Sequence, residues 1–130
     1  MQNNSKTIMW LGIVLILISG AIHLIDAQAS FDDATYKGWL FIANGLLAVI
    51  AAVGIYRGEQ TWGWRLGALV ATSTLLGYIA SRTIGLPQLP AEPDAWLEPL
   101  GITSVVAEGL FLALYAWLSR SERVTYRQLS

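Results

Sequence analysis

A few ionisable residues interrupt the long apolar runs of this chain, and they could carry chemistry. Glu108 lies within the run 99–119, about 13 Å along it if the run is a helix that rises about 1.5 Å per residue. His23 and Asp26 stand at positions i and i+3 near the end of the run 7–27, so a helix would place them on one face. Such groups are expensive in apolar surroundings unless they are protonated, paired or hydrated. These three residues are therefore the first candidates for a functional site.

Further polar residues fall near the same ends of the other runs. Asn44 is expected to make a hydrogen bond to a neighbouring helix through its side-chain amide. Arg82 is a basic residue with many acids near it, so we expect it to pair with a carboxylate. The candidate partners of Arg82 are Asp26, Glu98 and Glu108. The residues predicted to bind a ligand are His23, Asp26, Asn44, Tyr78, Arg82, Glu98 and Glu108.

The chemistry of this set stays open at the level of sequence. His23, Asp26 and Glu108 form a mixed nitrogen and oxygen set that Zn²⁺, Mn²⁺, Fe²⁺ or Ni²⁺ would accept. The same groups could instead relay protons, or bind an organic cation with the help of aromatic rings. The chain has no cysteine, which excludes disulfides, thiolate metal sites and iron–sulfur clusters. Its one histidine allows bis-histidine haem only across a dimer.

The elements that would position these residues are membrane-spanning helices. Of the 130 residues, 55% are hydrophobic and 13% are charged, against about 25% charged in a soluble domain. Apolar runs of about 20 residues, enough to cross a hydrocarbon core of about 30 Å, recur at 7–27, 38–56, 62–82 and 99–119. A helix satisfies its own backbone polar groups in lipid. The sequence predicts an all-α, integral membrane four-helix bundle in a single domain, 1–130, with an outer loop at 83–98.

Lysine and arginine predict the orientation of these spans, because short cytoplasmic flanks are enriched in both. One side holds six basic residues, Lys6, Arg57, Arg65, Arg120, Arg123 and Arg127, and the other side holds two, Lys37 and Arg82. Both termini are therefore expected in the cytoplasm, and the protein is expected in the plasma (inner) membrane as a multi-pass protein. The sequence Ala27-Gln28-Ala29 is a small-x-small cleavage pattern. The apolar run before it exceeds a signal peptide's usual 7–15 residues, so we expect the first span to be retained.

Side-chain patterns give further expectations about packing. On a helix, six residues of the first run would share one face and form a stripe. They are Gly12, Ile16, Ser19, Gly20, His23 and Asp26. This stripe is expected to face the interior of the bundle, because small residues let a neighbouring helix approach closely. The six tryptophans (Trp10, Trp39, Trp62, Trp64, Trp96 and Trp117) are expected to anchor the spans at the membrane interfaces.

The connections between the runs also carry expectations. Segment 28–37 is predicted to be a short acidic loop, and Gly58 suits the C-terminal cap of a helix in a tight turn. The residues from 120 onward are predicted to form a polar, frayed end. Three apolar residues in the proline-rich outer loop, Ile84, Leu86 and Leu89, suggest that the loop folds back over the bundle as a cap.

Part of the chain resembles a group of small four-span prokaryotic membrane proteins with an SRTxGLP loop. The resemblance rests on SRTIGLP at 81–87, EPLG at 98–101, Ala107-Glu108, and a first helix that ends in GAIHL at 20–24. A looser similarity to DoxX-like membrane proteins lies in the first-helix pattern and the late intramembrane glutamate. These resemblances imply four spans and an outer loop, and they favour His23, Arg82 and Glu108 for testing, without implying an activity.

Three functional hypotheses follow. The first is a protein that binds or transports a small polar ligand or cation through a pocket in the outer half of the bundle. The second is a structural or accessory subunit of a larger membrane complex, docked through small residues such as Gly67 and Ala71. The third, less favoured, is a membrane enzyme with His23 as base, Asp26 orienting it and Arg82 binding an anion. The lipid bilayer and a homo-oligomer or complex are the expected partners. A net charge of −1 excludes a basic surface for nucleic acid, and a mean hydropathy of +0.52 excludes a disordered chain.

Overall fold

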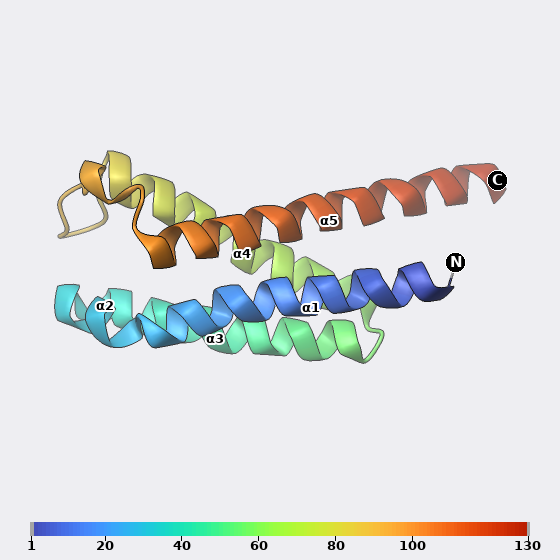
Figure 1. Ribbon diagram of the computed structural model, residues 1–130, viewed down its shortest axis with the longest axis horizontal. Coiled ribbons are helices and arrows are strands. Elements are labelled where there is room, and N and C mark those ends of the chain that lie inside the picture. The colour runs from blue at the N-terminus through green and yellow to red at the C-terminus, as the bar shows by residue number, and fades with distance from the viewer. Residues whose placement is uncertain (1, 130) are drawn as a thin grey trace.

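The computed structural model of the protein describes residues 2–129, and within them the side chains of residues 5–59 and 61–121. The described chain is all-α, as predicted. Its helices are α1 (Gln2–Ile25), α2 (Ala27–Asp33), α3 (Thr35–Tyr56), α4 (Gln60–Thr83) and α5 (Pro99–Leu129), with one turn of 3-10 helix, η1 (Pro93–Ala95). The four long helices lie lengthwise beside one another, and α1, α3, α4 and α5 run in alternating directions (Figure 1).

Three of the described helices are long and apolar enough to cross a membrane. They contain the segments Ser5–Ile25, Thr35–Tyr56 and Pro99–Ser121. Helix α4 is equally long but is not among them, because polar residues lower its hydropathy along much of its length. Three of the four predicted runs thus have the length and hydropathy that a membrane span requires.

The four long helices enclose a common interior, because each packs closely against two of the others. Helix α1 packs against α3 and α5, and α4 packs against the same two helices from the other side. The tight turn between α3 and α4 contains Gly58 at φ +80, which confirms its predicted place after the end of a helix. Both ends of the described chain lie at one end of the molecule, whereas α2 and the outer loop lie at the other (Figure 1). We refer to these as the terminal end and the loop end.

A packed apolar core fills the half of the molecule nearer the terminal end. Phe111, Ile16 and Ile55 are fully buried in it, and Trp64 stacks on Phe111 with ring centroids 5.2 Å apart. The expectation that Trp64 is an interfacial anchor is wrong, because its indole fills the space above this ring. A Cβ atom at Gly67 would lie 2.4 Å from Phe111 Cζ, so glycine is needed there.

The buried faces of α1 and α4 follow their small residues. Gly12, Ile16, Ser19, Gly20 and His23 are all buried, which confirms five members of the predicted stripe. The sixth, Asp26, follows the end of α1 and is only partly buried. A Cβ atom at Gly20 would lie 2.7 Å from Ala48 Cβ, which shows how closely α3 approaches. Gly67 and Ala71 are likewise buried inside this chain. They therefore do not form the external docking face that the accessory-subunit hypothesis assigned to them.

Two predicted irregular segments are helical. The prediction that segment 28–37 forms a loop is wrong, because α2 and the first turn of α3 occupy it. The break between α1 and α2 is a single residue, Asp26, and helix-type bonds from Asp26 N to Ile22 O and from Ser30 N to Asp26 O continue across it. The backbone of α5 continues to Leu129, so the predicted frayed end is also wrong. No proline or glycine follows Gly109, which leaves the helix without a breaker. The side chains of Arg123 and Arg127 lie outside the described residues.

The outer loop folds back onto α4, which precedes it, and onto α3. Gly85, at φ +86, allows a close approach, since its Cβ would lie 2.7 Å from Leu89 O. Leu86 and Leu89 exchange backbone hydrogen bonds of 3.1 and 2.9 Å, and Tyr36 of α3 donates to Pro87 O at 2.5 Å. Leu86 and Leu89 line a cavity at this end of the molecule, as a cap requires, whereas Ile84 is 86% exposed and points away from it.

Candidate functional site

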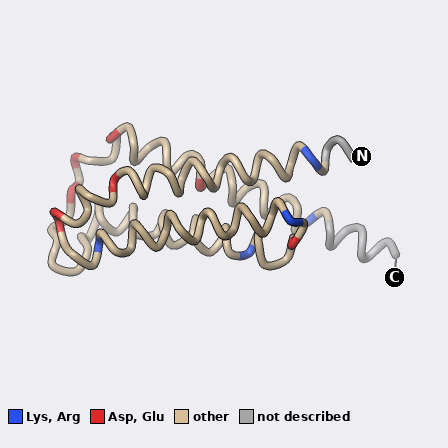
Figure 2. The backbone as a smooth tube through the Cα atoms, turned by 90° about the horizontal axis from the view of Figure 1, so that it is seen from below, with Lys and Arg blue, Asp and Glu red and all other residues tan. Residues whose placement is uncertain are grey.

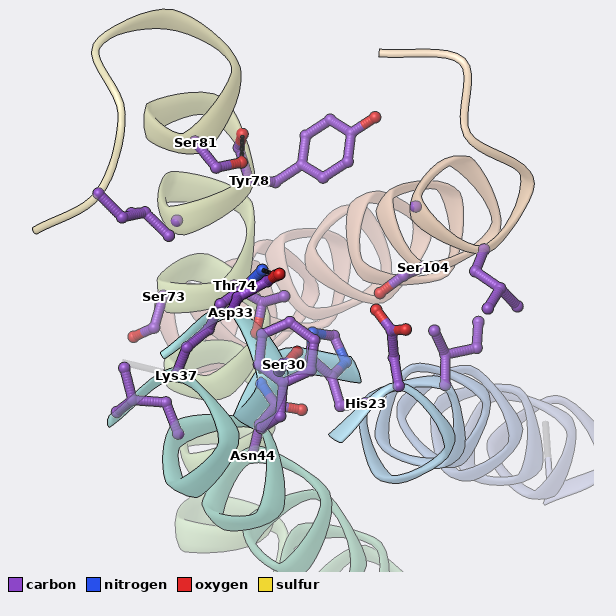
Figure 3. Close-up of a pocket in the computed structure, with 18 of the residues that line it drawn as sticks. His23, Ser30, Asp33, Lys37, Asn44, Ser73, Thr74, Tyr78, Ser81 and Ser104 are labelled. Carbon is purple, nitrogen blue, oxygen red and sulfur yellow. Dashed lines mark hydrogen bonds and ion pairs between the residues drawn. The ribbon is translucent and has the colours of Figure 1, made fainter. Parts of the chain in front are cut away.

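A cavity of about 820 Å³ occupies the half of the molecule nearer the loop end. This volume lies in the range of pockets that hold small organic ligands, about 300–1,000 Å³. The cavity brings together all seven residues predicted to bind a ligand: His23, Asp26, Asn44, Tyr78, Arg82, Glu98 and Glu108. Polar side chains from the surrounding helices converge on the hollow in Figure 3.

Glu108 lies at the deep end of the cavity and is fully buried. Its Oε2 accepts hydrogen bonds from Ser104 Oγ at 2.6 Å, one turn earlier on α5, and from Ser19 Oγ at 3.0 Å, across on α1. Its Oε1 has no hydrogen-bond partner among the residues that the structure describes. A buried acceptor in this state is costly, so one carboxyl oxygen is left for a group that the protein does not supply.

His23 is oriented by the backbone of its own helix. Its Nδ1 lies 2.7 Å from Ser19 O, and because a carbonyl only accepts, Nδ1 must carry a proton. The lone pair of the neutral ring is therefore on Nε2, and the described hydrogen bond of the ring engages Nδ1 alone. The ring packs against Phe41, with centroids 4.9 Å apart. The expected orienting role of Asp26 is wrong, because the Ser19 carbonyl takes it.

Asn44 joins α3 to α4, as the sequence predicts for an amide inside a bundle. Its Nδ2 donates to Thr74 Oγ1, and this hydroxyl in turn donates to Val70 O at 2.8 Å. Asn44 Oδ1 is buried beside the cavity, and within the described part of the chain nothing donates to it. The cavity thus holds a second acceptor oxygen without a donor.

Arg82 fixes the outer loop above the cavity. Its guanidinium lies 3.9 Å from the centroid of the Tyr78 ring and makes bonds to Ala95 O at 3.3 and 3.4 Å. It also donates to Ser81 Oγ at 2.7 Å and pairs with Glu98 Oε2 at 3.5 Å, so Glu98 is the partner among the three candidates. Tyr78 donates from its hydroxyl to Trp96 O at 2.6 Å. Arg82 and Tyr78 therefore direct their polar groups to the loop, although both line the cavity.

Substitution of Arg82 by lysine is expected to loosen the outer loop. Lysine keeps the charge but cannot make several forked bonds while it lies flat on Tyr78. We expect amide hydrogen exchange at Leu86, Leu89 and Glu92, whose N–H groups are bonded here, to be about tenfold faster, as loss of about 1.4 kcal/mol of local stability implies. Exchange mass spectrometry on the protein in nanodiscs measures this. The same substitution at exposed Arg65 is the control, and equal exchange in the two variants would contradict this role.

The structure does not favour the metal hypothesis. Among the residues that it describes, no three His, Cys, Asp or Glu side chains are close enough together to hold a metal ion. His23, Asp26 and Glu108 line the same cavity, but they do not lie close enough together to share one ion. The expectation that these three residues form a metal site is therefore not met.

The electrostatics of the cavity favour a cation. Of the described residues that line it, five are acids (Asp26, Asp33, Glu92, Glu98 and Glu108) and two are basic (Lys37 and Arg82). Both basic residues are already paired, Lys37 with Asp33 at 2.7 Å and Arg82 with Glu98. Opposite charge in a low-dielectric cleft is strongly attractive.

Sequence reasoning missed several lining residues. Ser104 and Thr74 hold Glu108 and Asn44, and Ser30, Tyr36 and Lys37 lie around the cavity near the loop end. The i−4 spacing of Ser104 to Glu108 was a readable signal, because residues four apart face each other on a helix. Lys37, at i+4 from Asp33, carried the same signal. Comparison with protein-family models, with curated proteins and with solved structures finds no match to this chain.

Proposed function

We propose that this chain is a four-span protein of the plasma membrane that binds or transports a small polar ligand or cation through the cavity at its loop end. Helix α4 is the fourth span. It runs from a tight turn to the outer loop between α3 and α5, which are apolar enough to cross a membrane. Its lower hydropathy has a physical reason: Thr74, Tyr78 and Ser81 line the cavity, whereas Leu76 and Ile79 are exposed to the surroundings.

The distribution of charge supports cytoplasmic termini. Figure 2 shows lysine and arginine gathered toward the terminal end and acids toward the loop end, with exceptions at both. Flanks rich in lysine and arginine stay in the cytoplasm. The cavity then opens on the outer side.

The single observation that carries the proposal is Glu108. A carboxyl group that only joined α1 to α5 would be satisfied by protein donors at both oxygens. Instead Oε1 has no partner in the described part of the chain, and Glu108 borders an open cavity lined by an excess of acids. Buried ionisable groups of this kind in membrane helices mark ligand and ion sites.

The cavity is blind in this structure, which supports a binding step on one side of the membrane. Its lining extends no deeper than Leu47 on α3, Leu69 on α4 and Glu108 on α5. The next turns belong to the core around Phe111. Transport would therefore require Phe111 and its neighbours to move.

Substitution of Glu108 by glutamine is expected to weaken cation binding about 10- to 100-fold, since a hydrogen bond to a charged group contributes about 1.5–3 kcal/mol. Glutamine keeps the shape and can still accept from Ser19 and Ser104. Binding of radiolabelled ethylammonium to the protein in phosphatidylcholine nanodiscs, measured by scintillation proximity, tests this.

The matched control is Glu59→Gln, which removes an exposed carboxylate in the turn between α3 and α4, away from the cavity. The control should bind as the wild type does. Absence of saturable binding to the wild type, or equal binding by the Glu108 variant, would refute the proposed site.

A further inference from the structure

Three acceptor atoms on residues that line the cavity receive no described hydrogen bond. Glu108 Oε1 and Asn44 Oδ1 are buried and have no hydrogen-bond partner among the described residues. His23 Nε2 is the unprotonated ring nitrogen, because Nδ1 donates to Ser19 O. Glu108 and His23 are 0% and 7% exposed, so bulk water does not solvate them freely. Two buried acceptors without donors, and a third acceptor on the same cavity, are matched by a group that carries several donors. A primary ammonium group carries three N–H donors, a positive charge and no acceptor.

The cavity has a second, apolar part that reaches the outer surface of two helices. Its lining includes Leu40 and Ala43 on α3, and Leu69 and Ser73 on α4. All four side chains are exposed, Leu40 at 61% and Leu69 at 64%. In the proposed topology these exposed surfaces face lipid, so the cavity opens sideways between α3 and α4. Figure 1 shows these two helices crossing at an angle, joined by the turn near the terminal end.

We infer that the ligand is an amphiphilic amine, whose primary ammonium head is held at Glu108, Asn44 and His23 and whose alkyl chain leaves between α3 and α4 toward the bilayer. This inference rests on the proposed function and adds the class of ligand and its route. A small hydrophilic cation would donate to the acceptors but leave the apolar side chains of the opening in contact with water. An uncharged lipid would fill the opening but leave the three acceptors without donors.

The chain-length dependence of binding tests the inference. Ethylammonium and octylammonium compete with radiolabelled ethylammonium for the protein in phosphatidylcholine nanodiscs, and affinities refer to the free aqueous concentrations. Each methylene transferred from water to an apolar site contributes about fourfold in affinity. We expect octylammonium to bind at least 100-fold more tightly than ethylammonium. Octanol, which has the chain without the charge, should not compete.

Two variants test where the alkyl chain of the ligand lies. Ser73→Trp and Ala43→Trp each place an indole in the opening, from α4 and from α3 respectively. Each should reduce the advantage of octylammonium over ethylammonium, measured on one sample, to less than about tenfold. Ethylammonium binding that is still saturable shows that the variant is folded. The control is Leu76→Trp, at a position of α4 that is 63% exposed and does not line the cavity. It should keep the full advantage.

The outcomes separate the two proposals. If the wild type does not bind ethylammonium, the proposed function fails and the inference fails with it. If ethylammonium binds but octylammonium binds no more tightly, or octanol competes equally well, only the inference is overturned. If both tryptophan variants still bind octylammonium at least 100-fold more tightly than ethylammonium, the lateral route between α3 and α4 is overturned. Should one tryptophan variant fail to fold, the other, on the opposite helix, decides.

Discussion

Replacement of Glu108 by leucine is expected to abolish cation binding while leaving the folded protein at least as stable as the wild type. A group retained for function is often costly to the fold. Here Oε1 is buried without a partner in the described chain, at a cost of about 1–3 kcal/mol that leucine removes. Ser19 and Ser104 need not be orphaned, because a helical serine can donate to the carbonyl four residues earlier.

Thermal unfolding in detergent, with binding measured on the same sample, gives both readouts. We expect the free energy of unfolding to be unchanged or to rise by about 1 kcal/mol. Phe111→Leu, one turn deeper on α5, serves as a reference for a substitution that should lower stability without removing the charge. If the Glu108→Leu variant instead unfolds well below the wild type, Glu108 serves to join α1 to α5, and the carboxyl is structural.

The helices and the buried face of α1 could be predicted because both depend on local sequence. A run of about 20 apolar residues predicts a span, and the spacing of Gly12, Ile16 and Ser19 determines which face of the helix is buried. The seven candidate ligand-binding residues could be selected for the same reason. Polar groups are rare in apolar runs, and helix length places most of these residues in one half of the bundle.

Contacts between helices could not be predicted, because they depend on how each helix is rotated and shifted along its neighbour. Asp26 follows His23 closely in sequence, yet the Ser19 carbonyl orients the imidazole. Ser19 lies 89 residues from Glu108 and donates to it. The expected metal site failed on the same point, since sharing a cavity does not bring three ligands within one coordination sphere.

Other errors arose where a general tendency competes with local packing. Tryptophan near the end of an apolar run is typical of a membrane interface, but Trp64 lies against Gly12, whose Cβ would lie 2.3 Å from the indole. A glycine on the facing helix thus makes room for a ring that hydropathy alone would place outside. The short connection 28–37 has acids typical of a loop, yet the bond from Ser30 N to Asp26 O continues the helix.

Substitution of Phe111 by alanine is expected to destabilise the protein strongly. Phe111 is fully buried, stacks on Trp64 and fills the space above Gly67, so its removal leaves a void that these neighbours cannot close. Loss of a buried phenylalanine costs about 3–5 kcal/mol in the free energy of unfolding. The control is Leu110→Ala on the same helix. Leu110 is 54% exposed, so this substitution should lower the free energy of unfolding much less. Denaturation of both variants in mixed micelles with increasing dodecyl sulfate compares them. A similar loss in the two variants would mean that the region between the cavity and the terminal end is not tightly packed around Phe111, and the cavity would then not be blind.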